Sequence, residues 1–63
     1  MKNSIHKVEP KVADEIIKTR KPLGLFFTFD SDTKLYIGID NMYGDARVEG
    51  FKSLSGCKRW LTI

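Results

Sequence analysis

The chain is poor in the residues that build disulfide, zinc and membrane proteins. It has one cysteine, Cys57, and one histidine, His6, among 63 residues, which excludes an internal disulfide and a zinc ribbon. No apolar run approaches the ~20 residues of a membrane-spanning helix, and residues 1–12, MKNSIHKVEPKV, lack the apolar segment of a signal peptide. These absences predict a cytoplasmic protein without a membrane partner.

The composition is that of one small folded domain. Hydrophobic residues make up 41% of the chain and aromatic residues 11%, which is more than a disordered segment contains. A chain of this length has room for little more than one small core. We therefore predict a single domain over residues 1–63, with residues 1–9 as a flexible leader.

Charge is distributed unevenly along the chain. The net charge is +3, but residues 1–22 carry six basic and three acidic side chains, residues 23–51 carry two basic and five acidic, and residues 52–63 carry three basic and no acidic ones. The ends are therefore basic and the middle is acidic. A partner that is attracted by charge must therefore be acidic where it meets the ends of the chain, or basic where it meets the middle.

Residues 10–20 are predicted to form a helix. Val8, Val12 and Ile16 recur every four residues and make one apolar stripe. Pro10 suits the first turn of a helix. Pro22 disfavours the helical conformation of the residue before it, so the helix should end there.

Between residues 23 and 51 the apolar period falls to about two, which is typical of β-strands. Segments 23–30 and 34–41 are rich in aromatic and β-branched residues and are joined by the polar loop Ser-Asp-Thr, and a third strand is predicted over 46–51. One apolar set should share the covered face of this sheet: Leu25, Phe27, Phe29, Leu35, Ile37, Ile39, Ala46 and Val48.

The last residues return to helical spacing. Leu54, Cys57, Trp60 and Leu61 form an apolar stripe, and Ser53 is a good N-cap. The predicted fold is therefore α+β, a three-stranded antiparallel β-meander flanked by an N-terminal helix and a short C-terminal helix, in the order α-β-β-β-α.

The acidic segments 30–34 and 38–51 are the first place to look for a metal site. A calcium loop needs oxygen ligands at alternate positions, a central glycine and a glutamate at the twelfth position. Counting from Asp30 places Lys34 fifth and Asn41 twelfth, and counting from Asp40 places Met42 third, so both segments fail. We predict that their Asp, Asn and Gly residues form turns, and that the protein needs no metal.

His6 and Cys57 do not indicate catalysis. A Cys–His pair needs a third orienting group and an oxyanion site, and the sequence suggests neither. Cys57 lies on an apolar stripe, where cysteine acts as a small hydrophobe. No glycine-rich phosphate loop is present, so we expect neither an enzyme nor a cofactor.

The outer face of the predicted sheet would hold Phe26, Tyr36 and Arg47. Two aromatic rings and an arginine can anchor a protein interface or stack unpaired bases. Acidic side chains on the same face would repel phosphate and favour a protein partner: Asp30, Asp40 and Glu49. The competing arrangement is that the first helix covers this face.

The ending GFKSLSGCKRWL, residues 50–61, after three predicted strands resembles the arm-type DNA-binding domains of tyrosine recombinases. The matching positions are packing positions: Phe51, Ser53, Cys57, Trp60 and Leu61. That resemblance implies a β-β-β-α fold and DNA contacts from a basic sheet face, whereas residues 23–51 carry two basic and five acidic side chains here.

Two further resemblances concern longer stretches. The order α-β-β-β-α is similar to that of double-stranded-RNA-binding domains, whose lysine-rich start of the last helix is represented by Lys52, Lys58 and Arg59. The run LGLFFTFD, YIGIDN and GDARVEGFKSL resembles short proteins of Gram-positive phages and mobile elements, which implies no particular activity.

The function predicted from the sequence is that of a small non-catalytic binding module. Its partner is expected to be a protein, in a regulatory role, with homodimerisation as one form of that binding. The alternative is a nucleic-acid-binding protein that uses the basic helices: Lys18, Arg20, Lys21, Lys52, Lys58 and Arg59. If the partner is a protein, we expect a free edge of the sheet to take part in binding, because unpaired strand edges recruit other strands.

Overall fold

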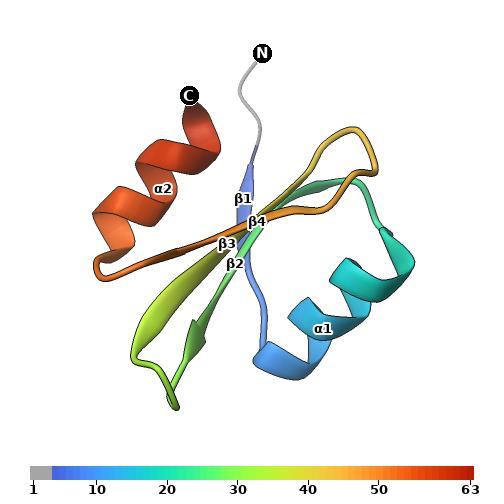
Figure 1. Ribbon diagram of the computed structural model, residues 1–63. Coiled ribbons are helices and arrows are strands. Elements are labelled where there is room, and N and C mark those ends of the chain that lie inside the picture. The colour runs from blue at the N-terminus through green and yellow to red at the C-terminus, as the bar shows by residue number, and fades with distance from the viewer. Residues whose placement is uncertain (1–3) are drawn as a thin grey trace.

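A computed structural model describes residues 4–63 of the chain and contains two helices and one sheet (Figure 1). The elements in chain order are β1 (Ile5–Lys7), α1 (Pro10–Thr19), β2 (Gly24–Asp30), β3 (Leu35–Asn41), β4 (Arg47–Phe51) and α2 (Leu54–Thr62). Both helices and the three strands β2, β3 and β4 lie where the apolar periods predict them, to within one or two residues.

The sheet has four strands in the order β1-β2-β3-β4. The strands β2, β3 and β4 form the predicted antiparallel meander. The addition is β1, which pairs parallel to β2 with Ile5 opposite Leu25. The predictions of three purely antiparallel strands and of a flexible leader over residues 1–9 are therefore wrong at β1; the part of the leader over residues 1–3 lies outside the described residues.

The helix ends follow local chemistry. Ser53 caps α2 by accepting a hydrogen bond from the Gly56 N–H at 3.1 Å, as predicted. Helix α1 begins at Pro10 and ends at Thr19. Its C-cap is Arg20, which has a left-handed conformation and whose N–H donates to the Ile16 carbonyl at 2.7 Å. Both helices are short, so packing against the sheet must stabilise them.

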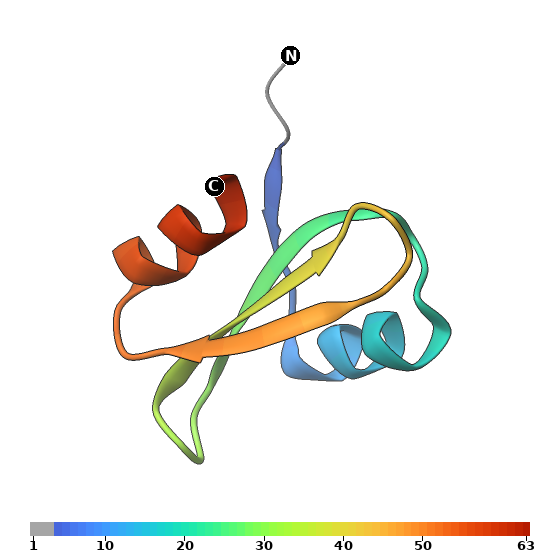
Figure 2. The same cartoon turned by 45° about the horizontal axis from the view of Figure 1, so that its top comes forward.

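The helices cover opposite faces of the sheet, as Figures 1 and 2 show from two directions. On one face, Ala13 and Ile16 of α1 pack with Phe26 and Ile39. We call this cluster the α1 core. The other face holds a second cluster, the α2 core, with these buried members: Leu25, Phe27, Cys57 and Leu61.

The two cores result from the register between β2 and β3. The hairpin loop contains four residues, 31–34, because Asp30 pairs with Leu35; the predicted three-residue loop would have paired Asp30 with Lys34. A shift of one residue moves alternate side chains to the other face. Phe27 is consequently opposite Gly38 and not Ile37, so the two apolar sets predicted to share one face lie on opposite faces.

A buried asparagine joins the two loops at one end of the sheet. Asn41 is fully buried. Its amide Nδ2 donates to the Pro22 carbonyl at 2.8 Å, and its Oδ1 accepts from the Ala46 N–H at 3.1 Å. The α1–β2 and β3–β4 loops are therefore held together by one side chain.

Candidate protein-binding edge

The predicted aromatic surface is not assembled. Phe26 is 6% exposed and lies in the α1 core, whereas Tyr36 packs against the α2 core and Arg47 is exposed. The prediction that these three residues share an open sheet face is wrong, because the one-residue change of register places Phe26 opposite Ile39. The competing arrangement, in which the first helix covers Phe26, is the one observed.

With both faces covered, the free edges of the sheet are the next candidates for binding. The direction of the unpaired backbone groups follows from one hydrogen bond, from the Val8 N–H to the Phe27 carbonyl at 2.9 Å. The polar groups of Phe27 therefore point toward β1 and away from β3. In an antiparallel ladder, such a residue forms a pair that exchanges no hydrogen bonds, and the partner of Phe27 is Gly38.

The same alternation continues across the sheet to β4. Since the polar groups of Gly38 point away from β2, they point toward β4, where Gly38 is opposite Glu49. Glu49 therefore exchanges its hydrogen bonds with β3. Its neighbours Val48 and Gly50 direct their N–H and C=O groups outward, to the free edge.

The outer edge of β4 is exposed and partly apolar. Residues 47–50 are all exposed, and Val48 keeps 42% of its surface accessible. Leu35 and Ile37 lie beside this edge on the α1 side: a methyl group built on Gly50 would be 3.3 Å from Leu35 Cδ1 and 3.6 Å from Ile37 Cδ1. An incoming strand would meet backbone polar groups with apolar side chains beside them.

The two edges of the sheet differ in what they offer. Strand β1 has three residues, and Pro10 lies three residues after its end; such short edges resist further pairing. Strand β4 has five residues, RVEGF. It contains no proline or lysine, the residues that most often protect an edge, so β4 is the less protected of the two edges.

The residues of the nucleic-acid alternative are divided between two places. All six are exposed. Lys18, Arg20 and Lys21 lie at the end of α1, and Lys52, Lys58 and Arg59 lie in or just before α2. Because the two helices cover opposite faces (Figure 1), one sheet face does not present both groups.

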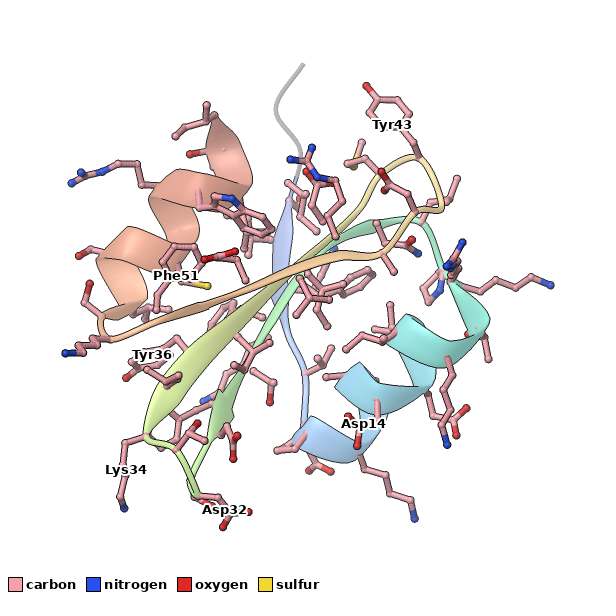
Figure 3. The ribbon with its side chains drawn as sticks, in the orientation of Figure 1. Asp14, Asp32, Lys34, Tyr36, Tyr43 and Phe51 are labelled. Carbon is pink, nitrogen blue, oxygen red and sulfur yellow. The ribbon has the colours of Figure 1, made fainter. Side chains whose placement is uncertain are left out.

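The acidic loops contain the predicted turn chemistry. Asp30 accepts hydrogen bonds from the Asp32 N–H and the Thr33 hydroxyl, both at 3.0 Å, and Asp40 accepts from the Met42 N–H at 3.2 Å. The labelled Asp32 and Lys34 project from the hairpin tip in Figure 3. Within residues 4–63, no three or more His, Cys, Asp or Glu side chains are grouped in a way that could hold a metal ion.

Cys57 is a packing residue, as its place on the apolar stripe predicts. Its side chain is fully buried in the α2 core, and burial raises the pKa of the thiol above its ordinary value. A thiol held in its neutral form is a poor nucleophile. The geometry therefore favours a structural role.

Two other surface features have no assigned role. Tyr43, 90% exposed, projects from the β3–β4 loop (Figure 3), and Leu23 of the α1–β2 loop is 64% exposed.

A separate hollow of about 280 Å³ is lined by residues 7–10 with Thr28 and Phe29. The Thr28 hydroxyl is buried and has no hydrogen-bond partner within residues 4–63, and the walls of the hollow are mainly apolar.

The sequence did not indicate that Val48 and Gly50 contribute to the exposed edge of β4. Alternation placed Val48 correctly on the same face as Ile39, but it could not indicate that α1 leaves this side of β4 exposed. Asn41 was also missed, because the pair Asp-Asn after a strand is more often a turn than a buried link between loops.

No protein-family model, no curated protein and no solved structure matches the chain. The likenesses to recombinase arm domains, double-stranded-RNA-binding domains and phage proteins remain resemblances of sequence pattern. Neither helix within residues 4–63 has the length and apolar character needed to cross a membrane.

Proposed function

We propose that the protein is a non-catalytic binding module that recruits another polypeptide through the free edge of β4. The observation that carries this proposal is the direction of the backbone at Val48 and Gly50, whose hydrogen-bonding groups face away from the sheet. An extended segment laid along them would add a fifth strand, the mode of binding called β-augmentation. Regulation of a partner by its capture is the role that such a module fits.

The surroundings of the edge support a protein partner over a nucleic acid. Val48, Leu35 and Ile37 offer apolar contacts on the α1 side, while Arg47 and Glu49 alternate with Val48 and project to the α2 side. A bound strand could match this pattern of apolar and charged side chains residue by residue. A phosphate backbone would approach a segment, 23–51, with two basic and five acidic side chains.

Nucleic-acid binding remains the second proposal, through the basic ends of the chain. Its support is charge alone: residues 52–63 have three basic and no acidic side chains. It would use the exposed surfaces of the helices and leave the β4 edge free. The two proposals therefore predict different sensitive residues.

A proline substitution at Val48 tests the first proposal. Proline is tolerated in an edge strand where the N–H faces outward, so Val48→Pro should leave the hydrogen bonds between β3 and β4 intact while it removes a donor from the free edge. Ser31→Pro, at the first position of the hairpin loop, is the matched control because proline is favoured early in turns.

The measurement is capture from a lysate of the native host by immobilised protein. The parent and Ser31→Pro should retain the same protein, and Val48→Pro should lose it. If all three forms capture the same proteins in the same amounts, the edge of β4 is not the binding surface.

A further inference from the structure

The charges along β4 are self-complementary about Val48. Arg47 precedes Val48, Glu49 follows it, and both charged residues are exposed. Resting on the proposed function, we infer that the polypeptide recruited by the edge is a second copy of this chain. The two β4 strands would pair antiparallel about a two-fold axis at Val48, giving one continuous eight-stranded sheet.

The backbone at Val48 permits this arrangement without change. Val48 directs its N–H and C=O outward, so two Val48 residues facing each other exchange two hydrogen bonds. In the same register, Gly50 of each copy would lie opposite Ala46 of the other. Ala46 precedes β4, has a left-handed backbone with φ of 47° and already donates its N–H to Asn41 Oδ1 at 3.1 Å, so the exchange of backbone hydrogen bonds is confined to Val48. Short chains often satisfy an open edge in this way, through an isologous contact in which the same residues serve both partners.

The side chains select this register. With the axis at Val48, Arg47 of each copy is directly opposite Glu49 of the other, in pairs that exchange no backbone hydrogen bonds and bring side chains closest together. Two oppositely charged cross-strand pairs therefore form at once, on the α2 side of the sheet. On the α1 side, the exposed Val48 side chains face each other across the axis.

Neighbouring registers lack this match. An axis at Glu49 would set two carboxylates opposite each other, and an axis at Arg47 would do the same with two guanidinium groups, which is unfavourable in both cases. An axis at Gly50 would place Glu49 opposite Phe51 and Val48 opposite Lys52, with no pairing of opposite charges. Among registers centred on a residue of β4, only that centred on Val48 joins opposite charges twice.

Charge exchange tests the register directly. In Arg47→Glu, the carboxylate at position 47 would face Glu49 of the second copy, and in Glu49→Arg, two guanidinium groups would face each other. Each single variant should dimerise at least about tenfold more weakly than the parent, because two cross-strand attractions become repulsions. The double variant R47E/E49R restores both pairs and should dimerise as the parent does.

A mixture of the two single variants provides the sharpest test. One variant has two acidic residues at positions 47 and 49 and the other has two basic residues, so the register centred on Val48 pairs them with opposite charges throughout. Sedimentation velocity over micromolar to millimolar concentrations should show two weakly associating variants that form a dimer when mixed. Circular dichroism spectra matching the parent establish that each variant is folded.

The outcomes separate this inference from the proposed function. A parent that stays monomeric throughout the concentration range, or a mixture that fails to dimerise, overturns the inference. If Val48→Pro nevertheless loses a captured protein that Ser31→Pro retains, the edge still recruits a different polypeptide and the proposed function stands. A dimer insensitive to Val48→Pro and to both charge changes forms elsewhere and also overturns the inference.

Discussion

At Gly38, the addition of a single methyl group should disturb the α2 core. It lies on β3 beneath α2, and a methyl group built on it would be 3.1 Å from Cys57 Sγ and 3.2 Å from both Cε3 and Cζ3 of Trp60. These distances are shorter than ordinary van der Waals contacts. Gly38→Ala therefore requires α2 to move outward or the indole ring to turn.

The magnitude follows from two opposing effects. Overfilling a packed core costs roughly 1–3 kcal/mol, while replacing glycine by alanine in a strand contributes about 0.5–1 kcal/mol in the other direction, because the unfolded chain loses freedom. The net expectation is destabilisation by about 1–2 kcal/mol. For a domain of this size, with a urea m-value near 1 kcal/mol/M, the midpoint should fall by about 1–2 M.

Gly50→Ala is the matched control. Gly50 lies on the adjacent strand, on the other face, and its nearest neighbours are the ends of the flexible Leu35 and Ile37 side chains. Urea unfolding followed by far-ultraviolet circular dichroism should leave Gly50→Ala at or slightly above the parent. In a Trp60→Leu background, the cost of Gly38→Ala should shrink. Equal midpoints for Gly38→Ala and Gly50→Ala would refute the packing argument.

Further predictions concern buried groups, charge and metal. Trp60→Ala should lower the free energy of unfolding by about 3 kcal/mol, the lower end of the range for a large aromatic residue, because Trp60 is only half-buried. If the fluorescence of Trp60 in the native parent has the emission maximum of an indole in water, this prediction is wrong. Asn41→Ala should cost about 2–4 kcal/mol, because it leaves the Pro22 carbonyl and the Ala46 N–H unpaired, and an unchanged melting temperature would argue against that role. Burial raises the pKa of the Cys57 thiol, so the contribution of the neutral thiol to folding stability should be present below the unfolded-state pKa and lost as pH rises through the folded-state pKa. The free energy of unfolding of Cys57→Ala should therefore fall less steeply at alkaline pH than that of the parent. Parallel plots of unfolding free energy against pH would contradict this prediction. A chelator should leave the melting temperature unchanged, whereas a drop would indicate a metal. Under the nucleic-acid alternative, the affinity for DNA or RNA should fall steeply as the salt concentration rises. It should also fall when the charge is reversed at the six basic positions Lys18, Arg20, Lys21, Lys52, Lys58 and Arg59. If neither change has an effect, or if no nucleic acid binds at low salt, that alternative is eliminated.

The sequence was sufficient to locate the helices and the meander because their signals are local. Apolar period, Pro10 and the Ser53 cap define elements within a few residues of themselves. Strand β1 was hidden because three residues, Ile-His-Lys, carry no alternation long enough to recognise. Its pairing with β2 depends on α1 folding back across the sheet, which is a tertiary effect.

The candidate site was mislocated because of a single residue. Assigning Lys34 to a strand made a three-residue loop, whereas Lys34 has a left-handed backbone with φ of 62° and belongs to the turn. Non-glycine residues adopt that conformation infrequently, so the residue type gave no warning. The error moved Phe26 from a buried face to an apparent open one, and the binding surface moved with it.

Covering the sheet on both faces gives the domain two separate compartments of apolar side chains. Phe26 and Phe27 are adjacent in the chain, yet they belong to different cores. Because the two clusters have no member in common, substitutions on opposite sides of the sheet should add independently in free energy, while those on one side couple. A mutation that loosens one compartment is therefore compensated most directly by a second change on its own side of the sheet.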